Sequence, residues 1–349
     1  MHRGEIQDRR RDERKPIWYS VGDRTGHCGR SRHDYRDVNA SSAPNAAVTM
    51  IPFVKRFDFV YGRRDQVSPL IQRVIADNPG PFTFTGTGTY IVGRPDRGAE
   101  VAVIDPGPPD QAHLAALMAA VEGRRVSHVL VTHTHRDHAP LARPFAEATG
   151  ARIWAARPPM RETHASGALD EDEDADFAPD VVLTGGEMIE GDGWTIETMF
   201  TPGHASNHMA FVMREENALF CGDHVMGWST TVVAPPDGSM SQYMASLDAV
   251  IAHDFDVLWP THGAPVTQVR PFLKAYRVHR LEREAQVLQR LAAGDRTIAE
   301  MVPVLYSAVD QRLWPAASLS VLAHLIKLVE DGAAISDGAP DLSAQFRLT

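Results

Sequence analysis

The feature that most constrains this chain is a short apolar run that ends in a cluster of metal-binding side chains. Residues 126–132 have the length and composition of a buried strand. His133, His135, Asp137 and His138 follow within six positions. Because alternate side chains of an extended segment point to one side, His133 and His135 face one position, and Asp137 and His138 on a tight turn can serve a second. Imidazole and carboxylate groups are ligands that zinc prefers, so the pattern predicts a metal site at a strand end.

Three later fragments repeat this arrangement, because each follows a short apolar run. They are Thr201-Pro-Gly-His204, Cys221-Gly-Asp223-His224 and Trp259-Pro-Thr-His262-Gly263. Together with the H-x-H-x-D-H motif at residues 133–138, and in this order, they resemble the metallo-β-lactamase superfamily of hydrolases over residues 83–263. The resemblance implies an α+β fold, a four-layer αββα sandwich in which four strand ends deliver the ligands to one edge.

The resemblance also implies a role for each polar residue of these motifs. One zinc would be held by His133, His135 and His204, the second by Asp137, His138 and His262, and Asp223 would bridge them. A hydroxide between the two ions would be the nucleophile, because two zinc ions lower the pKa of bound water towards neutrality. Asp137 would also orient this hydroxide or accept its proton, which makes it the predicted catalytic residue. Iron and manganese suit the same ligands, so the sequence leaves the metal open.

Two strands are expected at residues 83–93 and 101–107, joined by a turn at residues 95–98. Gly86-x-Gly88 lacks the Gly-Lys-Ser/Thr ending of a phosphate-binding loop and precedes a strand, so we interpret it as part of a hairpin. Asp105 ends the second strand at the edge that carries the ligands. By resemblance it accepts a hydrogen bond from a metal-bound histidine and so fixes the imidazole tautomer. The alternative is an Asp-Pro-Gly turn with no further role.

The residue at position 223 separates branches of the superfamily. The true β-lactamases best known for two zinc ions carry a cysteine at the corresponding position, where this chain has Asp223. Cys221 stands two residues earlier, where we expect it to pack in a strand. This difference disfavours antibiotic hydrolysis and favours the thioesterase, phosphodiesterase and RNA-processing members. His208 and His224 are expected to be hydrogen-bonded structural residues, although either is placed where it could touch substrate.

The chain divides into three predicted parts: residues 1–49, a catalytic domain at 50–268 and a winged-helix-like domain at 269–349. The first part carries ten Lys or Arg against seven Asp or Glu, a net +3, whereas the remainder carries 25 against 38, a net −13. Its polar composition predicts disorder, or a start codon assigned too early, with Met50 as the true beginning. The third part has helical patterns at 271–293, 297–306 and 318–330, the last two separated by Pro315.

Composition limits the partners and the compartment. No apolar run approaches the about 18 residues of a membrane span, and the N-terminus lacks an apolar signal core, so no membrane is expected. Two cysteines provide no disulfide framework, which fits a reducing cytoplasm. The net charge of −10 opposes charge-driven nucleic-acid binding, and residues 271–349 carry nine cations against nine anions. The acidic run at 170–174 is expected to be a solvated loop near the mouth of the site.

The residues around 222–247 resemble a branch that contains a mitochondrial single-strand endoribonuclease and fungal carrier-protein thioesterases. We therefore expect a dinuclear zinc hydrolase with a small-molecule substrate, a thioester or other acyl compound. The alternatives are a metal-dependent endoribonuclease on single-stranded RNA and a non-enzymatic winged-helix binding protein. The sequence is also compatible with a homo-oligomer. A deep, partly apolar pocket near Trp228 would support acyl hydrolysis, whereas clustered basic residues around the cleft would support the nuclease.

Overall fold

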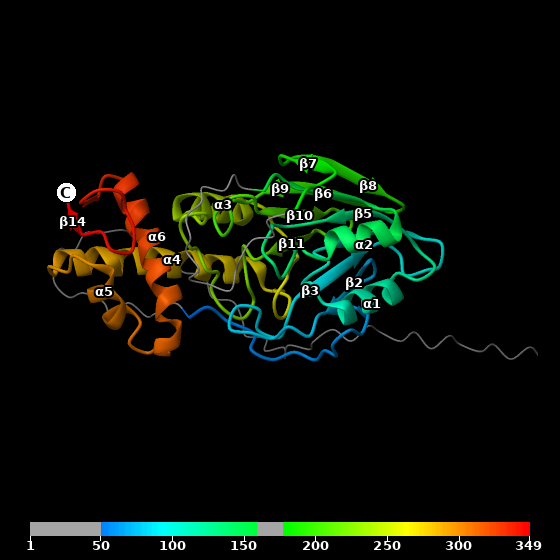
Figure 1. Cartoon of the computed structure of the whole chain (residues 1–349), viewed down its shortest axis with the longest axis horizontal. Coiled ribbons are helices and arrows are strands. Elements are labelled where there is room, and N and C mark those ends of the chain that lie inside the picture. The colour runs from blue at the N-terminus through cyan, green and yellow to red at the C-terminus, as the bar shows by residue number, and fades with distance from the viewer. Residues whose placement is uncertain (1–49, 159–176) are drawn as a thin grey trace, which may run out of the picture. The chain divides into compact units, whose positions relative to one another are not determined.

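The computed structural model describes residues 50–158 and 177–349, and its centre is a pair of β-sheets packed face to face (Figure 1). The first sheet contains, in order across it, β1 (Asp65–Gln66), β2 (Ile71–Ile75), β3 (Gly88–Val92), β4 (Glu100–Ile104), β5 (Arg125–Leu130), β6 (Arg152–Ala156) and β7 (Val181–Leu183). The second contains, in order of sequence, β8 (Met188–Gly191), β9 (Trp194–Phe200), β10 (Met209–Met213), β11 (Ala218–Gly222) and β12 (Val257–Pro260).

Apolar side chains from both sheets fill the space between them. Ile71, Tyr90 and Leu130 of the first sheet belong to the same buried cluster as Phe211 and Phe220 of the second. These side chains are at most 1% exposed, so their burial supplies a large share of the hydrophobic stabilisation of the fold. Strands β4 to β7 are parallel, as expected for strands that are covered on both faces.

Helices cover the outer faces of both sheets and complete the predicted αββα sandwich. Helices α1 (Gln111–Ala120) and α2 (Ala142–Thr149) bury their apolar sides on the first sheet, whereas α3 (Met240–Ala252) and the first half of α4 (Val269–Ala292) pack on the second. The carboxylate of Asp110 accepts a hydrogen bond from the backbone N–H of Ala112 at 2.7 Å and caps α1.

The hairpin predicted around the Gly-x-Gly sequence is confirmed, but it is shorter than expected. β3 pairs with β4 in antiparallel register, with Tyr90 opposite Ile104. The strand begins at Gly88 instead of residue 83, because Phe84 and Gly86 have positive φ angles of 55° and 110°. A left-handed backbone interrupts extended structure, so residues 83–87 form a turn.

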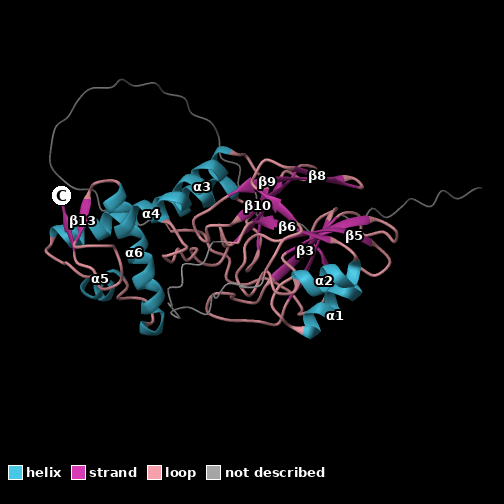
Figure 2. Ribbon diagram, turned by 45° about the horizontal axis from the view of Figure 1, so that its top comes forward, coloured by secondary structure: helices cyan, strands magenta, loops and turns pink. Residues whose placement is uncertain are grey.

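A small helical domain follows the sandwich (Figure 2). The second half of α4, α5 (Ile298–Leu305) and α6 (Trp314–Glu330) surround a separate apolar core with the hairpin β13 (Ala334–Ser336) and β14 (Phe346–Leu348). The helix expected from residue 318 begins at Trp314, because Pro315 occupies the first turn, where proline needs no intrahelical donor. Since α4 belongs to both cores, the domain boundary at 268–269 stays a prediction.

By length and composition alone, the stretch Gln311–Glu330 could also cross a membrane. Its buried side chains, including Val321, Leu322 and Leu325, lie in the core of the C-terminal domain, which is how the central helix of such a domain behaves. The predictions for residues 1–49 and for the acidic run at 170–174 lie outside the described residues.

Candidate metal centre

Four strand ends bring the seven predicted ligands together. His133, His135, Asp137 and His138 follow β5, and His204 follows β9. Asp223 stands directly after β11 and His262 two residues after β12. These strands belong to both sheets, so the site lies at the edge where the sheets meet.

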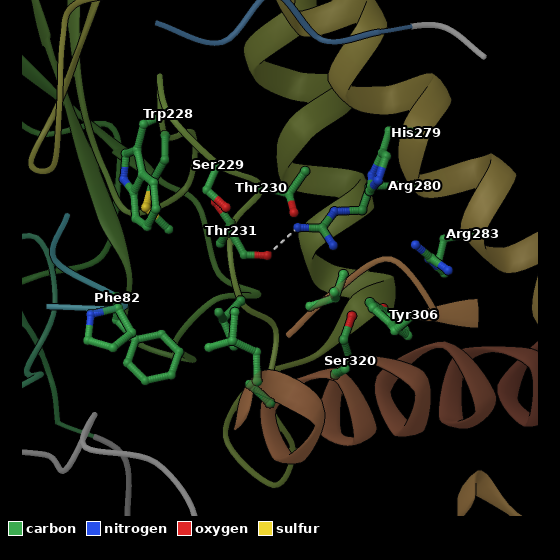
Figure 3. A pocket seen from close by; sticks show the side chains of 17 residues that line it. Phe82, Trp228, Ser229, Thr230, Thr231, His279, Arg280, Arg283, Tyr306 and Ser320 are labelled. Carbon is green, nitrogen blue, oxygen red and sulfur yellow. Dashed lines mark hydrogen bonds between the residues drawn. The ribbon is translucent and has the colours of Figure 1, made fainter. Parts of the chain in front are cut away.

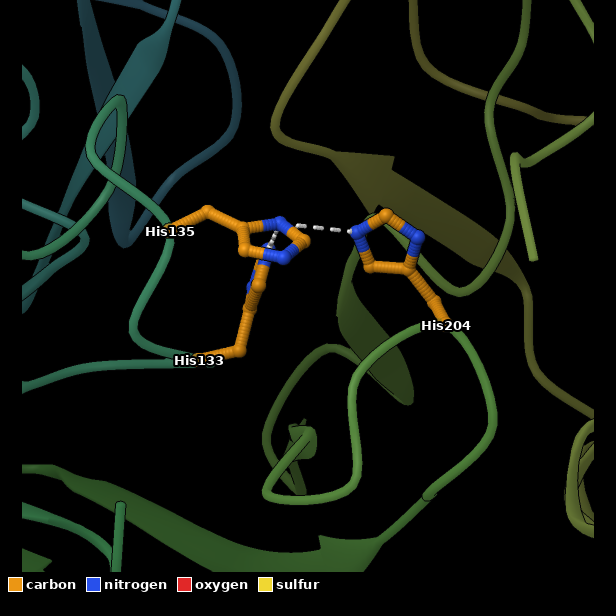
Figure 4. Close-up of side chains that lie close together, drawn as sticks. All are labelled: His133, His135 and His204. Atoms are coloured by element: carbon orange, nitrogen blue, oxygen red, sulfur yellow. Dashed lines mark hydrogen bonds between the residues drawn. The ribbon is translucent and has the colours of Figure 1, made fainter. Parts of the chain in front are cut away.

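The first group consists of His133, His135 and His204 (Figure 4). Nδ1 of His135 lies 2.9 Å from Nε2 of His133 and 3.2 Å from Nε2 of His204. All three imidazoles are at least nine-tenths buried. Three ring nitrogens that converge within 4.8 Å form a set that one cation can satisfy together.

The second group consists of Asp137, His138 and His262, with ligand atoms again within 4.8 Å of one another. Oδ2 of Asp137 lies 3.0 Å from Nε2 of His262 and 3.4 Å from Nε2 of His138. The two groups are therefore the two triads that the sequence predicts.

Asp223 lies between the two groups. One of its carboxylate oxygens is 3.7 Å from Nε2 of His138, and the other is 3.5 Å from Nε2 of His262 and 3.9 Å from Nε2 of His204. A single carboxylate thus reaches a member of each triad, which is the position required of a bridging ligand. The individual ligand assignments stay predictions.

Hydrogen bonds hold four of these imidazoles in one tautomer. Nδ1–H of His204 donates to the carbonyl of Val232 at 2.7 Å, and Nδ1–H of His262 donates to that of Gly86 at 3.2 Å. Nδ1–H of His138 donates to Asp105 at 2.9 Å, and the His133 Nδ1–H donates to the Thr132 hydroxyl at 3.0 Å. In each ring Nδ1 is the donor, so Nε2 is the atom left to bind a metal, as metal-binding histidines require.

The electrostatics of the centre follow from its burial and its two carboxylates. Burial and the neighbouring His138 lower the pKa of His133 well below its usual value, and burial with His204 lowers that of His135 to about 3. Burial would also lower the pKa of His262, but Asp223 and Asp137 raise it to about 10. Burial alone would raise the pKa of Asp223, yet the adjacent imidazoles lower it well below its ordinary range.

The residues present fit a pair of cations. Nε2 of His138, Nε2 of His262 and Oδ1 of Asp223 are buried atoms for which the described residues provide no hydrogen-bond partner. Buried polar atoms are ordinarily paired, because an unpaired group loses its hydration without compensation. Two cations bound by the triads would supply the missing partners. The chain therefore carries the histidine and aspartate groups of a dinuclear metal site, whose metal the donor set does not fix.

Asp105 contacts a predicted ligand, as the sequence implies. Besides the Nδ1–H of His138, its carboxylate accepts hydrogen bonds from the backbone N–H and the hydroxyl of Thr132, both at 2.8 Å, and from the hydroxyl of Thr261 at 3.1 Å. Its φ of 50° turns the chain sharply after β4 and aims the carboxylate at these donors. The alternative of a turn without further role does not account for these contacts.

Sequence reasoning left the role of His208 open. Its Nε2 accepts a hydrogen bond from the backbone N–H of Asp223 at 3.2 Å, so Nδ1 carries the proton and donates to Thr201 at 2.8 Å. A side chain at Gly222 would have its Cβ 2.5 Å from this Nε2. His208 and Gly222 thus position Asp223. The glycine of the Cys-Gly-Asp-His fragment is the feature of the sequence that could have indicated this close contact. Cys221 is fully buried, as expected for a packing residue.

A cavity of about 290 Å³ opens beside the centre and is lined in part by Trp228, Thr231 and Val232 (Figure 3). The carbonyl of Val232 accepts the hydrogen bond from His204, and the hydroxyl of Thr231 donates to the carbonyl of Asp223 at 2.7 Å. The indole of Trp228 stacks on Phe84, with ring centroids 4.7 Å apart. One loop therefore connects the wall of the cavity to His204 of the first group and to Asp223.

Comparison with known proteins agrees with this architecture. Residues 83–262 match the metallo-beta-lactamase superfamily, and residues 297–341 match the beta-lactamase associated winged helix domain. The sequence is 32% identical to a lactamase-like protein, notP, of an Aspergillus species over 77% of this chain and 83% of the relative. It is 33% identical to an atrochrysone carboxyl ACP thioesterase, dmxR1, of a Cryptosporiopsis species over 77% of this chain and 82% of that relative.

Solved structures share the fold. A beta-lactamase domain protein from Burkholderia ambifaria superposes with a TM-score of 0.71 at 22% identity, covering 87% of this chain and 99% of that protein. A metallo-beta-lactamase family protein from Thermus thermophilus gives a TM-score of 0.65 at 24% identity, covering 81% of this chain and all of that protein. With its two sheets, its metal-binding residues and its helical extension, the chain belongs to the metallo-β-lactamase superfamily and is a metal-dependent hydrolase with a C-terminal winged-helix domain.

Proposed function

We propose that this hydrolase cleaves a thioester or a similar small acyl substrate and uses two zinc ions. The observation that carries the proposal is the partly apolar cavity at Trp228, which adjoins the loop that carries Asp223. Two residues of the cavity wall, Val232 and Thr231, hydrogen-bond to His204 and Asp223, so an acyl group bound there would lie close to the metal-binding residues. Relatives at 29–33% identity named as atrochrysone carboxyl ACP thioesterases also support a thioester.

The reaction adds water to the thioester carbonyl, forms a C–O bond, breaks the C–S bond and transfers a proton from the water to the leaving thiolate, which departs as the thiol. The metal pair, when bound, supplies a nucleophilic water at neutral pH and Lewis acidity for the carbonyl oxygen. His133, His135 and His204 would hold one ion, and Asp137, His138 and His262 the other, with Asp223 between them. The side chain of Asp137 is 22% exposed against 8% for Asp223, so Asp137 is the carboxylate better placed to accept the proton of the attacking water.

Two cations of the winged-helix domain are paired with carboxylates, which argues against this domain as a binding surface for RNA. In the winged-helix domain, Lys327 contacts Glu284 at 3.2 Å and Asp331 at 2.6 Å, and Arg312 contacts Asp310 at 2.6 Å. Cations held by carboxylates release few counterions from a phosphate backbone, so they contribute little to nucleic-acid affinity. We infer that the domain supports the substrate cavity.

The proposal is tested with a panel of acyl thioesters and a labelled single-stranded RNA, each incubated with the wild type and with His135→Ala. We expect turnover of thioesters that disappears in the variant. RNA cleavage that disappears in the variant, without thioester turnover, would replace the proposal with the nuclease. Activity that persists in His135→Ala would identify a contaminating enzyme.

A further inference from the structure

The cavity beside the metal centre has a cationic side that the proposed hydrolysis does not use. Helix α4 presents His279, Arg280 and Arg283 to it, opposite the loop at Trp228 (Figure 3). His279 and Arg283 are one helical turn apart and therefore lie on the same face of α4. Apolar side chains line much of the rest, among them Phe82, Met226, Val309 and Leu313.

Arg280 is a buried cation without a carboxylate partner among the described residues. It is 3% exposed, its guanidinium donates to the carbonyl of Thr231, and its Cζ lies 4.9 Å from the ring centroid of Tyr243. Within the described part of the chain, its buried Nε has no hydrogen-bond partner. A charge taken out of water is costly unless a counter-charge accompanies it.

Arg283 extends this cationic side. Its Nη1 donates to the carbonyl of Leu305 at 2.9 Å, and its Cζ stands 4.2 Å from the ring centroid of Tyr306. It too makes no ion pair with a described carboxylate, whereas Arg277 of the same helix is paired with Asp248 at 2.5 Å. The positive charges at the cavity are therefore uncompensated, in contrast with the nearby surface cation.

The two arginines also affect the neighbouring His279. Burial, Arg280 and Arg283 lower its pKa to about 4, so the imidazole is neutral at pH 7 and can donate or accept a hydrogen bond. A planar carboxylate or a phosphate oxygen matches the fork of guanidinium donors, and such charge-assisted hydrogen bonds are about twice as strong as neutral ones. A ligand that complements this cavity has an apolar body and one anionic group.

We propose that the cavity binds an anionic group of the thioester substrate and that Arg283 and Arg280 set the preference for it. The inference rests on the proposed function and names the class of substrate. The anion is a carboxylate on the acyl group or the phosphate of a phosphopantetheine arm on the thiol side. Both sources present oxygen anions to the same guanidinium groups, and the substrates below distinguish them.

The test compares kcat/KM for three thioesters: hexanoyl-pantetheine, which is neutral, adipoyl-pantetheine, which ends in a carboxylate, and hexanoyl-phosphopantetheine. In the wild type we expect one anionic substrate to be preferred over the neutral one. Arg283→Gln should reduce that preference by about tenfold or more, as loss of a charge-assisted contact implies. Arg283→Lys, which keeps the charge but loses the fork, should retain part of it, and the matched control Arg277→Gln should leave it unchanged. Equal ratios in wild type and Arg283→Gln would overturn the inference.

A binding measurement without turnover separates this inference from the proposed function. Isothermal titration calorimetry with adipate and with phosphopantetheine should show that one of the two anions binds the wild type and binds Arg283→Gln more weakly. If the wild type hydrolyses no thioester but binds one anion in this manner, the cavity assignment stands and the proposed function fails. If thioesters are hydrolysed without preference for an anion, and neither anion binds, the proposed function stands and the inference fails. Circular dichroism of the variants verifies that they are folded.

Discussion

Replacement of Asp105 by asparagine tests how much the hydrogen bond from His138 to this carboxylate contributes to stability and to metal binding. The carboxylate is 1% exposed and accepts four hydrogen bonds, three at Oδ2 and one at Oδ1. All four partners are donors: the Nδ1–H of His138, the backbone N–H and hydroxyl of Thr132, and the hydroxyl of Thr261. An amide has one acceptor oxygen, so in Asp105→Asn at least one donor faces an NH₂ group.

The size of the effect follows from these contacts. If the amide oxygen takes the place of Oδ2, the backbone N–H of Thr132 loses its acceptor, at a cost of about 1–3 kcal/mol. The bond to His138 also loses its negative partner, which weakens the basicity of the ligand. Loss of such support typically lowers metal affinity by about 10–100-fold. We therefore expect Asp105→Asn to lose about 1–3 kcal/mol of unfolding free energy without metal and to bind zinc about 10–100-fold more weakly.

Urea unfolding of the metal-free protein measures the first quantity, and competition with a chromogenic zinc chelator measures the second. Asp256→Asn is the matched control, because Asp256 is exposed just before β12 and should change neither value. Zinc affinity of Asp105→Asn equal to that of the wild type would refute the role assigned to Asp105.

Three further changes test other parts of the structure. Tyr276→Phe removes the oxygen that accepts a hydrogen bond from the buried N–H of Thr231 at 2.7 Å, so urea unfolding should show a loss of about 1–3 kcal/mol, and no loss would contradict the contact. Thr297→Ala removes the capping box of α5 and should cost about 1 kcal/mol in the same assay; an unchanged midpoint would argue against the cap. Although burial alone would raise the pKa of Glu187, threonine hydroxyls lower it from 4.5 to about 2. A carboxyl whose pKa is lower in the folded than in the unfolded protein stabilises the fold at pH values above its pKa in the unfolded protein. This stabilisation is lost as the pH falls towards and through its pKa in the folded protein. Glu187→Gln should therefore show a shallower loss of stability between pH 4.5 and 2 than the wild type, and parallel curves would refute the assignment.

The sequence predicts the parts of this site that are local in the chain. Apolar runs that end in histidines indicate strand ends, and the seven predicted ligands form the two triads with Asp223 between them. Strand β5 (Arg125–Leu130) lies where the apolar run at residues 126–132 predicts a strand. These features depend on spacing within a few residues, which a single sequence displays directly.

The remaining features depend on contacts between distant segments. The link from His208 to the backbone of Asp223 spans two strands, and the carbonyl of Val232 meets His204 across 28 positions. No local pattern specifies such pairs. The cavity, likewise, is formed where α4 and α6 approach the loop at Trp228, and its cationic side becomes apparent only when the ion pairs of neighbouring cations are known. The start of α6 was misplaced because Pro315 ends a helical pattern as readily as it begins one.

Hydrolysis by this protein should depend on two metal ions held by these triads. The most direct measurement is thioester hydrolysis by chelator-stripped protein as zinc is added back, with bound metal per chain determined at each point, for the wild type and Asp223→Ala. We expect no activity without metal, activity that rises with occupancy of the second site in the wild type, and loss of activity in the variant. Hydrolysis by the metal-free protein, or an Asp223→Ala variant as active as the wild type, would contradict this dependence.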